Sequence, residues 1–299
     1  MVSTAQPVSP QIGQRDLRVG EYARFARRWG RRSIVYGGLG GLFFFLFFPL
    51  AWMLSTAFKT MDQAFAIPPV WISTRPTFDN FASLADHTFA TYFKNSVLVS
   101  SATTFVTVLI ASLSAYSFTR LRNRTARALF GLILASQMFP LTLLLIPIYL
   151  MVRDLGLFNT YWALILANLA FALPFCVWFL RSYFETIPIE LEEAALIDGC
   201  NRVTALWYVI IPLARPGVLA SAFFTFLLAW DEFLMALTLI NRDELRTLSP
   251  GLIISYVGEF GYRWPQMMAA SLIVTLPLIV VFGFFSRYLI QGLTEGALK

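Results

Sequence analysis

Residues 161–180 read YWALILANLAFALPFCVWFL, twenty consecutive positions without Asp, Glu, Lys or Arg. A helix needs about 20 predominantly apolar residues to cross a hydrocarbon layer about 30 Å thick. The core helices of soluble proteins rarely carry an uninterrupted apolar run of this length. The segment therefore predicts a helix that spans a membrane.

Similar apolar runs lie on both sides of this segment, and together they predict an all-α polytopic membrane protein with six transmembrane helices. Pro140 and Pro147 lie in the outer half of the third run, where a missing backbone donor is expected to kink the helix. The five further runs are residues 34–56, 96–118, 128–151, 218–240 and 267–288.

Composition supports a membrane protein, because 58% of the residues are hydrophobic and only 13% are charged. Soluble domains carry about 25% charged residues. The net charge of +6 comes from Arg residues at the flanks of apolar runs, a pattern that fits anionic lipid headgroups better than nucleic acid. Cys176 and Cys200 have no paired or metal-ligand spacing, so we expect two unpaired thiols and no metal site.

The distribution of Lys and Arg predicts the orientation of the spans. Residues 1–33, which we expect to form a partly disordered Arg-rich tail, and the loops at 120–127 and 181–215 carry most of these charges. The positive-inside bias makes their side cytoplasmic, and six spans then place both termini there. The expected segments are this tail, a first helix with an external loop at 34–90, a transmembrane core at 91–288 and a cytoplasmic C-terminus at 289–299.

The polar segment at 186–217 reads TIPIELEEAALIDGCNRVTALWYVIIPLARPG and predicts two short helices on the cytoplasmic side. Acidic residues favour the start of the first helix, and Gly199 can end it in a left-handed conformation. Pro212 is expected to stop the second helix. The small apolar side chains of the first helix have no lipid to face, which indicates a surface for a protein partner.

This segment resembles the EAA loop of permease subunits of binding-protein-dependent ABC importers. The family's usual ending is Ile, any residue, Leu, Pro, whereas residues 209–212 read VIIP. Further resemblance to the carbohydrate-uptake branch, and to its maltose-type second permease subunit, lies in IPP at 67–69, FKNS at 93–96, IDG at 197–199 and GLTEGALK at 292–299. The positions that carry the loop resemblance are Glu193, Ala194, Ala195, Gly199 and Pro212.

The resemblance implies a type I ABC importer transmembrane domain in a bacterial or archaeal cytoplasmic membrane. It implies that Glu193 makes polar contacts with an ATPase cleft, that Ala194 and Ala195 permit close packing, and that Gly199 provides the turn. Asp198 is expected to help fix the loop. The implied partners are a homologous permease subunit, two ATPase subunits and an external substrate-binding protein.

The chain lacks the Gly-rich phosphate loop GxxxxGK followed by Ser or Thr. We therefore expect no cofactor in this chain and no enzymatic activity, with ATP and Mg²⁺ bound by the partner ATPase.

Asp231 and Glu232 lie midway along the run at 218–240, and Asn168 is the only strongly polar side chain in the run at 161–180. Ionisable groups inside a span are costly unless they face water or a partner, so these three residues are candidates for lining a pathway. The family commonly has Asn where this chain has Asp231. An alternative is that the two carboxylates lie near the outer end of the span or pair with a basic group of a partner.

The alternatives to a sugar permease are a secondary transporter, a membrane enzyme and an ABC permease for a non-sugar solute. A secondary transporter should show inverted repeats or several coupled intramembrane charges, which are not evident. A membrane enzyme needs a cluster of acids, bases or metal ligands, and the chain has one histidine and no such cluster. An ABC permease for a non-sugar solute is disfavoured only by the carbohydrate-type motifs.

Overall fold

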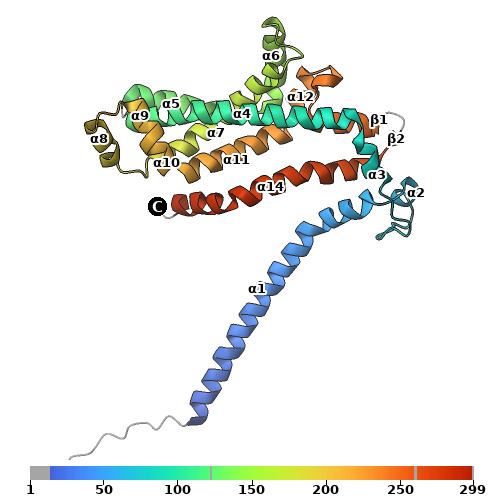
Figure 1. Cartoon of the computed structure of the whole chain (residues 1–299). Coiled ribbons are helices and arrows are strands. Elements are labelled where there is room, and N and C mark those ends of the chain that lie inside the picture. The colour runs from blue at the N-terminus through green and yellow to red at the C-terminus, as the bar shows by residue number, and fades with distance from the viewer. Residues whose placement is uncertain (1–13, 122, 259–260, 298–299) are drawn as a thin grey trace, which may run out of the picture. The chain divides into compact units, whose positions relative to one another are not determined.

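The computed structural model describes residues 14–121, 123–258 and 261–297 (Figure 1). The chain divides into two compact units, residues 1–55 and 56–299. The first unit is built on the long helix α1, Gln14–Ala57, whose stretch from Arg32 is apolar enough to cross a membrane. Residues 14–33, expected to belong to a partly disordered tail, thus form the start of a helix, and residues 1–13 lie outside the described part.

The second unit is almost entirely helical. Its first half contains α2 (Met61–Ala64), α3 (Asp79–Ala82), the 3₁₀ turn η1 (Ser83–Ala85), α4 (His87–Arg120), α5 (Arg124–Ser136), α6 (Leu141–Asp154) and α7 (Tyr161–Phe184). The chain continues through α8 (Ile189–Ile197), α9 (Arg202–Ala205), the π-helical turn η2 (Leu206–Ile210), α10 (Ile211–Leu213), α11 (Arg215–Asp231) and α12 (Leu234–Leu239). It ends with the 3₁₀ turn η3 (Asp243–Leu245), α13 (Leu248–Tyr256), the antiparallel strands β1 (Val257–Gly258) and β2 (Gly261–Tyr262), and α14 (Trp264–Ala297).

Four described helices are long and apolar enough to cross a membrane unbroken: α1 from Arg32, α4, α7, and α14 up to Ser286. Two further spans are bent pairs of helices, so the predicted number of six is reached when each pair counts as one crossing. The all-α membrane class is therefore confirmed. The prediction of a continuous fifth span is wrong, whereas the third span, which was expected to kink at its prolines, is bent by 101°.

The third predicted span, residues 128–151, consists of α5 and α6, which meet at 101°. Pro140 stands at the N-cap of α6, where its missing N–H costs no helical hydrogen bond. The residue before a proline avoids helical geometry, so α5 ends before this point. The bend thus lies at Pro140, one of the two prolines where a kink was expected, and it separates two helices.

The fifth predicted span, residues 218–240, is interrupted between Asp231 and Leu234. Glu232 has an extended backbone, with φ −64° and ψ 126°, and α12 begins after Phe233. The second bent pair lies earlier, where α10 and α11 meet at 85° near Ala214. The polar residues of this run therefore lie at a helix break and not inside a continuous helix.

The core of the second unit forms where α4 packs against α7 and α11, and α11 in turn packs against α14 (Figure 1). One apolar cluster joins Ala115 of α4 and Leu180 of α7 to Ile210 of η2, at the α8 end of α4. A second joins Val99 and Leu164 to Leu239 of α12, toward the other end. The two clusters fix the short helices at both ends of the bundle to the spanning helices.

Asn95 and Ser96, the last two residues of the FKNS motif, attach the chain around η3 to α4. The Asn95 amide donates to the backbone oxygens of Glu244 and Arg246 at 2.9 and 2.8 Å, and accepts a 2.7 Å hydrogen bond from the Tyr161 hydroxyl. Ser96 Oγ accepts from the Leu248 backbone N–H at 2.8 Å. These buried contacts give the motif a structural role.

Gly217 allows α11 to approach α7 closely, and its replacement tests this packing. A Cβ atom at this position would lie 2.6 Å from the ring of Tyr183. We expect Gly217→Ala to destabilise the detergent-solubilised protein by about 1–3 kcal/mol through overpacking. Gly131→Ala, where nothing lies within 4 Å of the added Cβ, is the matched control. Equal apparent melting temperatures of the two variants would contradict the close approach.

Candidate functional site

Two regions contain the residues singled out from the sequence: the loop at 186–217 and the break after α11. In the loop, α8 starts after Pro188 and carries Glu190 and Glu192 in its first turn, where carboxylates favour the positive end of the helix dipole. Gly199 has φ +93°, which confirms the predicted left-handed conformation. The loop and helices α8–α10 lie at one end of the α4–α7 bundle (Figure 1).

The end of α8 is a Schellman motif. The Cys200 N–H donates to the Ala195 carbonyl at 3.0 Å, and the Gly199 N–H donates to the Leu196 carbonyl at 3.2 Å. This arrangement requires a left-handed residue after the helix cap, which glycine adopts without steric cost. The chain then turns into α9, whose Asn201 side chain accepts a 2.9 Å hydrogen bond from the Thr204 N–H.

The second helix of the loop does not stop at Pro212, so that prediction is wrong. Helical structure continues through α9, the π-turn η2 and α10 to Leu213, with Pro212 exposed inside α10. A π-turn changes the hydrogen-bond register by one residue and allows the backbone to adjust around a residue that has no N–H. The bend to α11 follows at Ala214.

A buried carboxylate attaches α8 to the end of α4. Glu192 accepts a hydrogen bond from the Tyr116 hydroxyl, and its Oε2 lies 2.5 Å from Nε of Arg120. The side chains of Arg120 and Glu192 are only 10% and 6% exposed. This ion pair was not predicted from the sequence. It attaches the loop to a spanning helix.

The outward face of the loop contains most of the residues that the resemblance had marked. Glu193, Ala194, Asp198 and Gly199 are exposed, whereas Ala195 is buried within the chain. Of the two alanines, only Ala194 is therefore available to a partner. Large apolar side chains are exposed on the same loop: Leu191, Ile197, Val203 and Tyr208.

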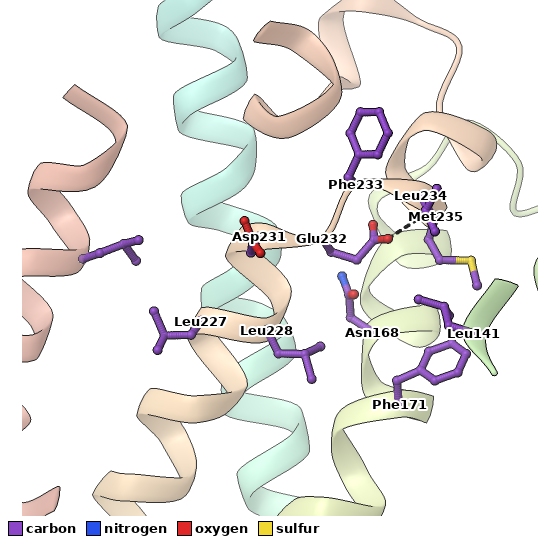
Figure 2. A pocket seen from close by; sticks show the side chains of 11 residues that line it. Leu141, Asn168, Phe171, Leu227, Leu228, Asp231, Glu232, Phe233, Leu234 and Met235 are labelled. Atoms are coloured by element: carbon purple, nitrogen blue, oxygen red, sulfur yellow. Dashed lines mark hydrogen bonds between the residues drawn. The ribbon is translucent and has the colours of Figure 1, made fainter. Parts of the chain in front are cut away.

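The break between α11 and α12 opens onto a cavity of about 660 Å³. Asn168, Asp231 and Glu232 all line it, so the structure brings together the three polar residues that the sequence suggested for a pathway (Figure 2). The remaining lining is apolar: Leu141, Phe171, Leu227, Leu228, Phe233, Leu234, Met235 and Leu278.

The two adjacent carboxylates have different surroundings. Glu232 caps α12, because its Oε1 accepts from the Met235 N–H at 2.7 Å and its Oε2 accepts from the Ala236 N–H at 2.8 Å. Asp231 is exposed and ends α11. Within the described residues, Asp231 has no ion pair, and no group of three potential metal ligands occurs. The polar groups that line the cavity are thus one helix-capping carboxylate, one exposed carboxylate and one amide.

Comparison with known families identifies the type of protein. Residues 107–295, which include both the loop and the cavity break, match the family described as "Binding-protein-dependent transport system inner membrane component". The chain belongs to this family. It is thus a multi-pass permease subunit of an ABC importer and is not itself an enzyme.

Curated relatives agree with this assignment. The permease is 39% identical over 253 residues to the sulfoquinovosyl glycerol transport system permease SmoH of Agrobacterium fabrum, covering 84% of this chain and 88% of the relative. It is 35% identical to the diacetylchitobiose uptake system permease DasC of Streptomyces coelicolor, covering 92% and 98%. It is 36% identical to the trehalose/maltose permease MalG of Thermococcus litoralis, covering 84% and 91%.

The fold of the permease matches that of solved importers. A bacterial ABC transporter involved in the import of the acidic polysaccharide alginate superposes with a TM-score of 0.76 at 23% identity, covering 89% of this chain and 98% of that chain. A second alginate transporter structure, in complex with a pentasaccharide-bound periplasmic protein, superposes with a TM-score of 0.68 at 16% identity. The predicted type I importer transmembrane fold is therefore confirmed.

Proposed function

We propose that this permease carries a saccharide across the membrane and is driven by a separate ATPase that docks on the loop at 186–217. The named cargoes of three relatives support the saccharide, since they are a sulfoquinovosyl glycerol, diacetylchitobiose and trehalose or maltose. The alignments cover 88% and 98% of the first two relatives and 84% and 92% of this chain, so the resemblance extends over most of the transport subunit.

The single observation that carries the ATPase proposal is the exposed face of the loop. Ile197 is 86% exposed, although it lies on α8, which no candidate spanning segment includes. Exposed apolar side chains away from lipid indicate a protein partner. Glu193 and Ala194 lie on α8 with free outward faces, where a carboxylate can make a charged contact and a small side chain permits close approach.

The ion pair between Glu192 and Arg120 connects the docking surface on α8 mechanically to the spanning helix α4. When ATP closes two ATPase subunits, each moves a docked α8, and the buried pair transmits that movement to α4. Because α7 and α11 pack on α4, movement of α4 changes the access of solutes to the cavity after α11. In this proposal ATP and Mg²⁺ are bound by the ATPase, a second permease subunit completes the pathway, and an external binding protein delivers cargo.

This mechanism places the loop at 186–217 and both chain termini in the cytoplasm, which agrees with the distribution of Lys and Arg. Asp231 and Glu232 then lie at the end of α11 opposite the cytoplasmic loop, at the cavity through which cargo passes.

Uptake measurements test the cargo and the energy source together. Cells with the complete transporter should accumulate a radiolabelled saccharide, and cells with Glu193→Lys in this chain should lose at least about 90% of that uptake because a charge-reversed α8 docks poorly. Glu190→Lys, also exposed on α8, is the control for a change of charge alone. Accumulation of a labelled amino acid or phosphate instead, or uptake driven by a proton gradient without ATP, would contradict the proposal.

A further inference from the structure

The cavity after α11 has an unusual charge balance for a binding site inside a membrane. Two carboxylates line it, and no Lys, Arg or His is among its described lining residues. Its other lining side chains are apolar apart from Asn168. A charge in such surroundings is weakly screened, so the sign of the cavity's field matters for any solute that enters it.

Of the two carboxylates, that of Glu232 is already hydrogen-bonded to backbone groups of the protein. Both of its oxygens accept backbone N–H groups at the start of α12, at 2.7 and 2.8 Å. Its charge is partly offset by these donors and by the positive end of the helix. Glu232 therefore maintains the break in the span, and a solute contact would compete with the cap.

Asp231 has no comparable compensation. It is exposed, and its side chain forms no ion pair or hydrogen bond with the described residues. It stands at the last position of α11, where unpaired backbone carbonyls contribute further negative charge. The uncompensated negative charge of the cavity therefore comes mainly from Asp231.

Asn168 provides a second, independent indication that the cavity holds a polar solute. It is only 3% exposed, and its amide has no hydrogen-bond partner within the described part of the chain. Its amide atoms are not among the fully buried polar atoms without a partner, so they are open to the cavity that Asn168 lines, where water or a ligand can complete their hydrogen bonds. Figure 2 shows this amide facing the break, near the Glu232 carboxylate, with Leu228 reaching toward it from α11. An amide can donate to and accept from the hydroxyl groups of a sugar.

We infer that Asp231 makes this half of the pathway selective for charge: the cavity admits uncharged or amino-bearing saccharides and disfavours anionic ones. The inference rests on the proposed saccharide transport and specifies its cargo class. Neither the fold nor the family sets this preference, because an importer of the same fold takes up an acidic polysaccharide and the 39% identical relative is named for a sulfonated, anionic sugar. Asp231, at the end of α11, supplies this charge preference.

Thiol labelling measures the field in the cavity directly. Leu228 lines the cavity, is 40% exposed and lies one helical turn before Asp231, so Leu228→Cys places a reporter thiol there. The same chain carries Cys200→Ser, which removes its partly exposed native thiol. Cys176 is fully buried and is expected to stay unlabelled. Membrane vesicles with the complete transporter are treated with methanethiosulfonates of equal size that carry either a trimethylammonium or a sulfonate group.

We expect the cationic reagent to react faster than the anionic one, and Asp231→Asn to reduce the ratio of the two rates by about tenfold, because attraction and repulsion are lost together. Asp154→Asn, which removes an exposed carboxylate away from the cavity, should leave the ratio unchanged. An unchanged ratio in Asp231→Asn, an equal change in both variants, or no labelling by either reagent would overturn the inference.

The same vesicles distinguish a failure of this inference from a failure of the proposed function. If an ATPase drives the permease, ATP should change the labelling rate of Leu228→Cys whatever the charge of the reagent. Rates that do not respond to ATP would count against ATP-driven transport, and the ratio between the reagents would still report the charge of the cavity.

Discussion

Replacing Glu192 with alanine is expected to lower the apparent melting temperature of the purified permease by roughly 10 °C and to abolish ATP-driven uptake. The change leaves Arg120 buried without its partner, which costs about 3–5 kcal/mol in proteins. It also removes the hydrogen bond from Tyr116. The α8 helix then loses its attachment to α4, and docking of an ATPase no longer moves the spanning helices.

Two variants show whether the buried pair is responsible. Glu190→Ala removes an exposed carboxylate from the same helix and should change the melting temperature little. Arg120→Met combined with Glu192→Leu removes both charges and should recover most of the stability, because the penalty comes from the unpaired charge. Thermal unfolding in detergent measures all three. A Glu192→Ala protein as stable as Glu190→Ala would show that the pair does not hold the loop.

Gly199→Val is expected to reduce ATP-driven uptake at least tenfold while leaving membrane insertion intact. Gly199 has φ +93°, and a β-branched residue there costs about 1–3 kcal/mol of backbone strain. No atom lies within 4 Å of an added Cβ, so the effect is conformational and not a clash. Relief of the strain opens the Schellman turn and changes the direction in which α8 faces its partner.

Gly156→Val provides the matched control for Gly199→Val. Gly156 also has positive φ, +69°, and open space around its Cβ position, but it lies in the turn between α6 and α7. The same type of strain should there affect stability and leave ATPase binding unchanged. Normal uptake by Gly199→Val, or equal loss in both variants, would contradict a special role of the loop.

The positions of the spans and the shape of the EAA-like turn could be predicted because each depends on local sequence. Uncharged runs of about 20 residues require burial in lipid. The left-handed turn depends on Gly199 itself, which few other residues can replace. A kink in the third span was predicted from Pro140, but the size of the bend and the break in the fifth span were not, since hydropathy gives the length of an apolar run but not its path.

Local signals for one of these breaks do exist. Glu232 precedes the apolar segment LMALTL by one residue and accepts its first free N–H groups, which is the arrangement of a helix cap. The charged pair in a long apolar run could therefore have indicated two helices. By contrast, nothing near residue 192 distinguishes Glu192 from Glu193, because the buried partners Tyr116 and Arg120 lie 76 and 72 residues away in sequence.

Co-purification tests directly whether the loop at 186–217 couples this permease to a separate ATPase. The tagged chain is expressed with its complete transporter, purified in mild detergent, and compared with Gly199→Val and Gly156→Val. We expect an ATPase and a second permease subunit to be recovered with the native chain and with Gly156→Val, and the ATPase to be lost with Gly199→Val. Recovery of a folded native chain without any ATPase, or equal recovery with all three chains, would contradict this coupling.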